Sequence, residues 1–306
     1  MKSIFIAMLI ISCTFIVRAR DIVPFDIEPD TNLPQVEVYI NGDSVPFRFI
    51  VDTGCSAIFA NSNNRRLVNL LNLNESDTVE YAHSSAIIRK TQFDNSLQLG
   101  TLTIDSVQIF VDDDPSAEYD GIIGQSLFER FSKVGIFPDS KILIFCENGE
   151  SLRITDGVIL PLDRTAGVYG TNLSIKTDKG DLGGIFMLDT GFAGILNVNS
   201  DFSKNHKLSN ILTPIANNSL KDGAGEKDNT IMVTAPRIIF ANESMPLLPI
   251  SLNVNSHQQE WNKTFNGVIG YDLLKRFRMI WDYENMTITL APSFEYFSPV
   301  TSVNHQ

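Results

Sequence analysis

The chain has 306 residues, of which 43% are hydrophobic and 20% are charged, a composition typical of folded domains and far from that of disordered proteins. Its 36 acidic residues outnumber 24 basic ones and give a net charge of −12. This balance argues against binding to nucleic acid or to an anionic membrane surface. Three cysteines are too few for a disulfide framework. The length allows one large or two medium domains.

Residues 1–19 have the pattern of a secretory signal peptide. Lys2 supplies the positive start, Ile4–Val17 is mostly apolar, and a small-residue cleavage site ends at Ala19. The apolar run is too short for a comfortable transmembrane helix. We therefore expect cleavage after Ala19 and a secreted or periplasmic mature protein. A second interpretation stays open, because Cys13 ends a lipobox-like stretch and its lipidation would tether the protein to a membrane.

The sequence contains an internal repeat with a period of about half the chain. Phe49–Gly54 and Phe186–Gly191 each carry three apolar or aromatic residues followed by Asp-Thr-Gly. Further along, Gly121–Phe131 is echoed by Gly267–Phe277. Because the two signatures recur in the same order with similar separations, we expect two halves of one architecture.

The first half favours β structure. Val36–Ile40 alternates between apolar and polar residues, Asn41–Asp43 has turn chemistry, and Pro46–Val51 returns to apolar residues. Leu97–Ile104 and Val107–Val111 predict a second hairpin.

The second half follows the same plan. Leu173–Ile175 and Ile185–Leu188 flank a predicted turn over Thr177–Gly184. Arg237–Phe240 and Leu247–Leu252 predict the counterpart of the second hairpin.

Each half also closes in the same way. A Leu/Phe pattern after each Gly-x-x-Gly predicts one short helix, and closing hairpins are expected over Val134–Phe145 and Met279–Leu290. The region Asp156–Thr171 has mixed polarity, three glycines and a proline. We therefore predict a signal peptide over 1–19, an N-terminal lobe over 20–157 and a C-terminal lobe over 158–306, in an all-β fold with few helices.

An apolar strand that runs directly into Asp-Thr-Gly is chemically informative. The strand would hold the aspartate at a buried end, the glycine allows a sharp turn and a close approach by a neighbour, and the threonine hydroxyl can bond to another segment. A single copy carries little weight, because an aspartate that caps a turn is common. Two copies in matching surroundings point to a catalytic pair, Asp52 and Asp189.

At this point the sequence resembles the aspartic peptidases, of both the pepsin and the retroviral types. The resemblance rests on the two Asp-Thr-Gly triplets, on Ile122–Gly124 and Val268–Gly270, and on the closing tail over Trp281–Leu290. It implies an all-β, bilobal, pepsin- or retropepsin-like pair of β-barrels with few short helices. In that family each apolar-apolar-Gly segment passes beside a catalytic loop.

The resemblance also implies a mechanism. Two carboxylates held close together share one proton, so that one can activate a water molecule while the other polarises the scissile carbonyl. We expect Asp52 and Asp189 to form this dyad in a single-chain monomer that hydrolyses peptide or protein substrates without a cofactor, a metal or a covalent intermediate. The residues expected to support the dyad are Thr53, Gly54, Thr190 and Gly191.

Two residues depart from the family pattern. A small residue, favoured with a hydroxyl, commonly follows Asp-Thr-Gly, whereas this chain has Cys55 and Phe192. Phe192 is bulky and its side chain donates no hydrogen bond, so a second hypothesis stays open: a non-catalytic peptide-binding module that retains the fold.

The remaining signals are weaker. A flap is expected within Ser76–Phe93, with its tip at Tyr81–Ser85, and a second mobile tip at Lys221–Glu226; both are equally compatible with simple exposed loops. The four histidines have no metal-ligand spacing. Cys55 has no histidine near it in the sequence to activate it as a nucleophile, and its pairing with Cys146 stays open.

Overall fold

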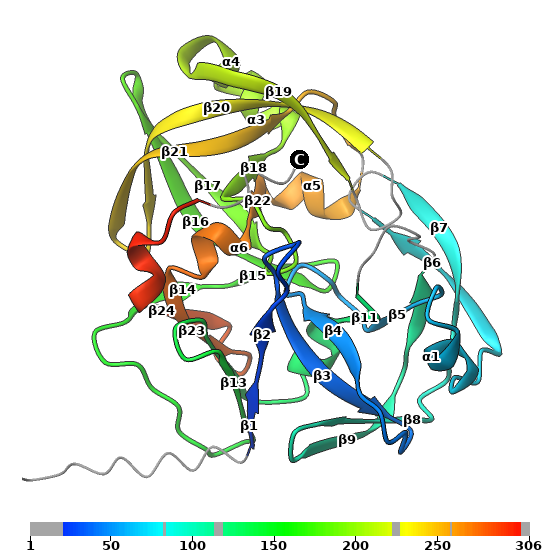
Figure 1. The fold of residues 1–306 in the computed structure, drawn as a ribbon. Coiled ribbons are helices and arrows are strands. Elements are labelled where there is room, and N and C mark those ends of the chain that lie inside the picture. The colour runs from blue at the N-terminus through cyan, green and yellow to red at the C-terminus, as the bar shows by residue number, and fades with distance from the viewer. Residues whose placement is uncertain (1–20, 82–83, 113–118, 222–226, 258, 301–306) are drawn as a thin grey trace, which may run out of the picture.

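The computed structural model describes residues 21–81, 84–112, 119–221, 227–257 and 259–300. Strands dominate this part of the chain, and they form three sheets of ten, eight and six strands. In the view of Figure 1 the eight-stranded sheet lies at the top and the ten-stranded sheet at the lower right. The structure is therefore the all-β, two-lobed fold that the sequence predicts.

The ten-stranded sheet is built from the first half of the chain. Its order is β6-β7-β10-β5-β11-β4-β3-β8-β9, with β2 added on β3. Its strands are β2 (Asp26–Ile27), β3 (Pro34–Ile40), β4 (Phe47–Val51), β5 (Phe59–Asn61), β6 (Glu75–Glu80), β7 (Ser85–Lys90), β8 (Asn95–Leu99), β9 (Leu102–Val107), β10 (Phe110–Asp112) and β11 (Gly121–Ile123).

The eight-stranded sheet is built from the second half, in the order β15-β16-β17-β22-β18-β21-β20-β19. Its strands are β15 (Asp163–Thr165), β16 (Val168–Thr177), β17 (Gly180–Leu188), β18 (Leu196–Val198), β19 (Thr213–Lys221), β20 (Lys227–Phe240), β21 (Glu243–Asn253) and β22 (Gly267–Ile269).

The six-stranded sheet joins the halves, in the order β1-β13-β12-β23-β24-β14. Its strands are β1 (Asp21–Pro24), β12 (Lys133–Phe137), β13 (Ile142–Cys146), β14 (Val158–Pro161), β23 (Phe277–Asp282) and β24 (Thr287–Pro292). The two predicted closing hairpins meet here, because β12 pairs antiparallel with β23 and places Val134 opposite the fully buried Trp281. The lobe bounds 20–157 and 158–306 remain a prediction.

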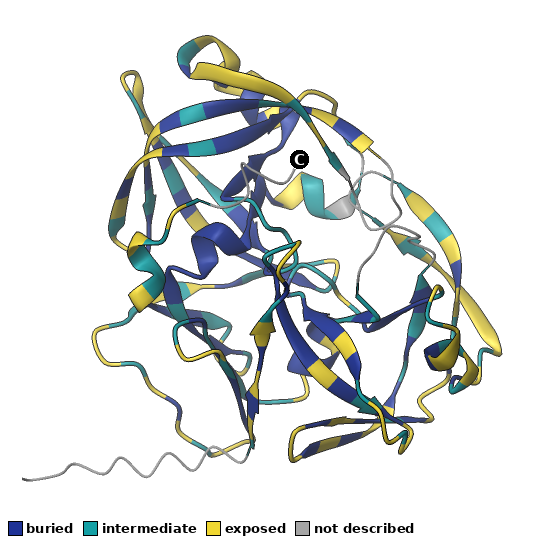
Figure 2. Cartoon of the chain, in the orientation of Figure 1, coloured by how far each residue is buried: buried dark blue, intermediate teal, exposed yellow. Residues whose placement is uncertain are grey.

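The helices of the described residues are short. They are α1 (Arg65–Asn69), α2 (Gln125–Phe128), α3 (Ser200–Asn205), α4 (Leu208–Ile211), α5 (Glu260–Thr264), α6 (Tyr271–Leu274) and the 3-10 helix η1 (Phe294–Phe297). The helices predicted after each Gly-x-x-Gly are α2 and α6, and Figure 2 shows α6 buried along its whole length. None of the helices in the described ranges is long and apolar enough to span a bilayer.

Each half contains the same interlock of strands. In the first half β11 lies between β4, with which it runs parallel, and β5, with which it runs antiparallel. In the second half β22 lies in the same way between β17 and β18. The apolar-apolar-Gly segments thus pass directly beside the strands that end in Asp-Thr-Gly, as the resemblance implies.

Most predicted hairpins are confirmed, but one joins different strands from those predicted and another has a shorter turn. The hairpin predicted from Leu97–Ile104 with Val107–Val111 is wrong, because Gly100, at φ +56°, makes the turn inside the first segment. The next strand, β10, instead pairs with β5 and β7. In the second half the turn after Thr177 is shorter than predicted, since Gly180 already begins β17.

Candidate active site

The two candidate catalytic residues occupy equivalent places at the ends of matching strands. Asp52 follows β4, and its N–H donates to the carbonyl of Ile123 on β11 over 2.9 Å. Asp189 follows β17, and its N–H donates to the carbonyl of Ile269 on β22 over the same distance. The interlocking strands therefore fix where each aspartate leaves its sheet.

The two threonines hold these loops together across the lobe interface. The Thr53 N–H donates to Thr190 Oγ1 over 3.0 Å, and the Thr190 N–H donates to Thr53 Oγ1 over 3.1 Å. Each hydroxyl then donates onward to the opposite strand end, Thr53 to the carbonyl of Leu188 (2.9 Å) and Thr190 to that of Val51 (2.6 Å). Because both threonines are fully buried, losing any of these bonds would leave an unpaired group inside the protein.

The two glycines allow each loop to approach the opposing carboxyl group. A Cβ placed on Gly54 would overlap the carboxyl group of Asp189, and one on Gly191 would overlap that of Asp52. In addition, each glycine N–H donates over 2.8 Å to the aspartate of its own triplet. No larger residue would let the pair come together in this geometry.

The two carboxyl groups are half-buried and hydrogen-bonded to each other, which separates their acidities. Burial, and then the negative charge of Asp52, raise the pKa of Asp189 well above its ordinary value. Burial also raises the pKa of Asp52, but there the hydrogen bond from Asp189 acts in the opposite direction. One proton is therefore shared, with Asp189 favoured as its holder and Asp52 as the ionised partner.

The residues that follow the triplets do not touch the carboxylates with their side chains. Cys55 Sγ donates to the carbonyl of Ala57 at 3.4 Å. The ring of Phe192 lies against Gly194 and Gly270, where a Cβ would collide with it, and packs beside a buried apolar cluster that includes Phe265. The backbone N–H of Cys55 donates to the main-chain carbonyl of Asp52 at 3.4 Å, and the backbone N–H groups of Cys55 and Phe192 act to lower the pKa of Asp52 and Asp189 respectively.

One further support exists on the Asp52 side alone. Gln125, the first residue of α2, donates from Nε2 to the carbonyl of Thr53 over 2.8 Å. Its Oε1 accepts from the hydroxyl of Tyr283, also over 2.8 Å. Sequence reasoning missed this bridge; the position of Gln125 directly after the Gly-x-x-Gly motif was the available signal, but nothing in the pattern indicates the distant Tyr283.

The dyad opens into a cleft of about 580 Å³. The β6–β7 hairpin borders this cleft and lies within the predicted flap range; its exposed strands are visible in Figure 2. At its end Tyr81 lines the cleft, and its hydroxyl donates to Asp112 on β10 over 2.9 Å. From the second half, Val168, Met187 and Trp261 complete the lining. No sequence pattern predicts the contact between Tyr81 and Asp112, which are far apart in the chain.

The cysteines, the predicted loop tips and a possible metal site remain to be placed in the structure. Cys55 and Cys146 are both free thiols, and burial followed by the charge of Asp52 raises the pKa of Cys55, which disfavours a nucleophilic thiolate. Residues 82–83 of the first predicted tip and 222–226 of the second lie outside the described residues, as does the predicted signal peptide. Within the described ranges, no group of three His, Cys, Asp or Glu residues is arranged to hold a metal.

Comparison with known proteins agrees with this geometry. Residues 36–127 match a family model described as aspartyl protease. Among solved structures, the crystal structure of the aspartic proteinase from Irpex lacteus has a similar fold, with a TM-score of 0.61 and 14% sequence identity over 92% of this chain and 99% of that chain. No curated protein matches the sequence. Residues 36–127, which include the first Asp-Thr-Gly loop, are thus similar in sequence to the aspartyl proteases, and the chain shares the two-lobed fold of an aspartic proteinase.

Proposed function

We propose that the protein is an aspartic endopeptidase in which Asp52 and Asp189 activate water between them. The observation that carries the proposal is the half-buried, hydrogen-bonded carboxyl pair, in which each carboxyl group lies against the glycine of the opposite triplet; the pKa values of both are raised by desolvation, and Asp189 is favoured as the protonated member. Two like charges this close in a buried site do not both ionise, so the pair offers one base and one acid at the same time.

The proposed reaction uses both members of the pair. Water bound between the carboxyl groups gives a proton to ionised Asp52, and its oxygen attacks the peptide carbonyl carbon. Asp189 gives its proton to the carbonyl oxygen, which forms a neutral tetrahedral diol. Collapse of the diol breaks the C–N bond as the amide nitrogen takes the proton from Asp52. Asp189 recovers a proton from the diol, so one water is consumed and no covalent intermediate forms.

The cleft supports a peptide or protein as the substrate. It runs past the dyad between the β6–β7 hairpin and Trp261, and both apolar and polar side chains line it. A volume of about 580 Å³ lies within the usual range of ligand pockets and accommodates several residues of an extended chain.

Separate replacement of the two aspartates tests the proposal. We expect Asp52→Asn and Asp189→Asn each to abolish cleavage of casein between pH 3 and pH 7, because either variant lacks a full acid–base pair, and we expect pepstatin to inhibit the unmodified protein. Near-normal cleavage by either variant would contradict the shared-dyad mechanism. Peptide binding by the unmodified protein without any cleavage would favour the binding-module hypothesis instead.

We further propose that the protein is exported and acts as a monomer. The support for export is the signal pattern over residues 1–19, and the support for a monomer is that both aspartates come from one chain. N-terminal sequencing of the mature protein tests the first proposal: a start at Arg20 is expected, whereas a lipid-modified start at Cys13 would show the lipoprotein alternative. Gel filtration tests the second.

A further inference from the structure

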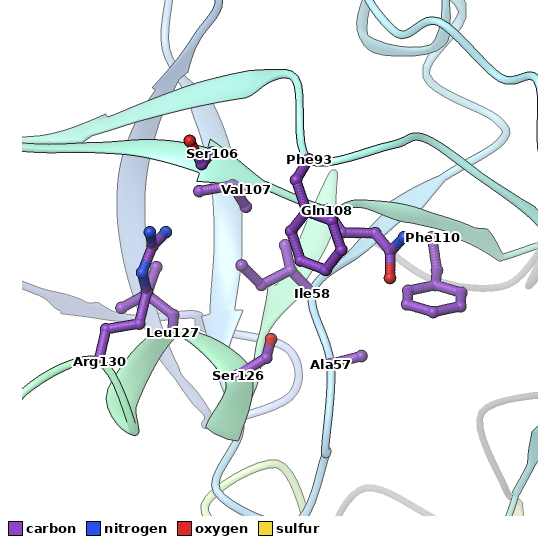
Figure 3. A pocket seen from close by; sticks show the side chains of 10 residues that line it. All are labelled: Ala57, Ile58, Phe93, Ser106, Val107, Gln108, Phe110, Ser126, Leu127 and Arg130. Atoms are coloured by element: carbon purple, nitrogen blue, oxygen red, sulfur yellow. The ribbon is translucent and has the colours of Figure 1, made fainter.

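A second hollow lies in the first lobe, outside the catalytic dyad. It has a volume of about 470 Å³, and Figure 3 shows the side chains that line it. Ile58, Val107 and Leu127 form a buried apolar wall. Phe93 adds an aromatic ring that is 68% exposed, so its apolar face is accessible to a ligand in this hollow. We call this hollow the accessory pocket.

The accessory pocket adjoins the catalytic cleft. Ala57 and Phe110 line both spaces. Phe110 also packs against Phe59 of the cleft, with ring centroids 5.5 Å apart. The two spaces are therefore neighbours that share these two residues as a common border.

The pocket has one cation in its wall. Figure 3 shows the Arg130 side chain rising beside Leu127 toward Val107. Arg130 is exposed, and within the described ranges it makes no ion pair, whereas its neighbour Glu129 is already bound to Arg164 over 3.0 Å. In a chain whose net charge is −12, a guanidinium left without a carboxylate beside an apolar wall favours an acidic group from a ligand.

We propose that the accessory pocket binds a part of the substrate polypeptide beyond the cleft, with an apolar side chain next to an acidic one. The apolar side chain would pack against Ile58 and Val107, and the carboxylate would pair with Arg130. This inference rests on the proposed function, because it takes the substrate to be a peptide held in the catalytic cleft. The preference for this apolar and acidic pair in the substrate would depend on residues outside the carboxyl pair.

Binding to an inactive protein tests the pocket without requiring turnover. The full chain carrying Asp52→Asn and Asp189→Asn is titrated with a short labelled peptide that fills the cleft and with longer peptides that add Leu-Glu, Leu-Gln or Leu-Lys at either end, and binding is followed by fluorescence anisotropy. The Leu-Glu extension at one end is expected to tighten binding about tenfold, Leu-Gln less, and Leu-Lys least. Equal affinity for all peptides would overturn the proposal.

Matched variants locate the effect. In the same inactive background Arg130→Glu is expected to remove most of the gain from Leu-Glu and to favour Leu-Lys, because it reverses the charge in the pocket wall. Arg153→Glu makes the same charge change at another exposed arginine and is expected to leave the gain intact. Ser126→Trp fills the pocket from an exposed position and is expected to abolish the gain of every extension.

Two readouts separate this proposal from the proposed function. If the unmodified protein cleaves the short peptide but Arg130→Glu and Ser126→Trp leave the preference for Leu-Glu unchanged, the accessory pocket proposal is wrong and the peptidase stands. If the unmodified protein cleaves nothing while the inactive protein shows the Arg130-dependent preference, the pocket stands and the peptidase proposal fails.

Discussion

The two Asp-Thr-Gly loops are nearly identical where they touch each other and differ at the residue that follows each triplet. Each aspartate leaves its strand at the same register, and the threonines exchange equivalent hydrogen bonds of 3.0 and 3.1 Å. Beyond the triplets, Cys55 bonds to a nearby carbonyl, whereas the ring of Phe192 lies against Gly194 and Gly270. Within the two loops, the symmetry therefore ends after the Asp-Thr-Gly triplets.

This difference shows which features of the loops the dyad needs. Main-chain N–H groups supply donors to both carboxylates, and an N–H is available whatever the side chain of that residue is. The residue that follows Asp-Thr-Gly can therefore be a cysteine in the first loop and a phenylalanine in the second. In contrast, the threonine positions need a hydroxyl that bonds across the interface, and the glycine positions need the absence of a side chain next to the opposing carboxyl group.

The largest effects are expected at the two glycines. Gly54→Ala and Gly191→Ala each place a methyl group where the opposing carboxyl group lies, so the pair must separate. A displacement of about 1 Å costs roughly a hundredfold in rate, and we expect at least that loss of kcat/KM from either variant. A loss of kcat/KM in only one of the two variants would show that the two glycines are not equivalent.

The threonines come next, with an effect on stability. Thr53→Val and Thr190→Val keep the shape but remove a buried hydroxyl that both donates and accepts. Each is expected to lower the free energy of unfolding by about 1–3 kcal/mol and to reduce kcat/KM. Thr53→Ser and Thr190→Ser retain the hydroxyl and serve as controls. Urea unfolding measures the difference. Equal stability of the Val and Ser variants would show that the hydrogen bonds of the threonine hydroxyls do not stabilise the protein.

A smaller effect is expected at Phe192. Its half-buried ring packs beside Phe265 and its cluster, so Phe192→Thr should lower the free energy of unfolding by about 1–2 kcal/mol, less than the cost of truncating a fully buried phenylalanine. Because the ring does not contact the dyad, kcat is expected to stay within about threefold, a change below 1 kcal/mol. A large gain in kcat would instead show that the native residue impairs the second loop.

The smallest effect is expected from the bridge found only on the Asp52 side. Tyr283→Phe removes the hydroxyl that donates to Gln125 and leaves a buried acceptor unpaired, at a cost of about 1 kcal/mol. The Gln125 bond to Thr53 remains, so we expect a modest fall in melting temperature and little change in kcat. A strong loss of activity would mean that the two loops depend on unequal supports.

Sequence patterns sufficed for the parts of the molecule that repeat. The two Asp-Thr-Gly triplets pointed to the carboxyl pair, and the alternation over 36–40 together with the apolar run over 46–51 predicted the strands leading to Asp52. What they missed depends on contacts between distant segments, such as Tyr283 with Gln125 and Tyr81 with Asp112. The misplaced hairpin has a local cause, because turn chemistry at Gly100 competed with a long apolar stretch.

The measurement that tests the central claim most directly is the pH dependence of kcat/KM. Below the pKa of Asp52 both carboxyl groups are protonated and no base remains, whereas above the pKa of Asp189 both are ionised and no acid remains. Because burial raises both pKa values, the account predicts a bell-shaped profile whose two flanks both lie above the ordinary aspartate pKa. A single flank, with activity maintained as the pH rises, would contradict the shared proton.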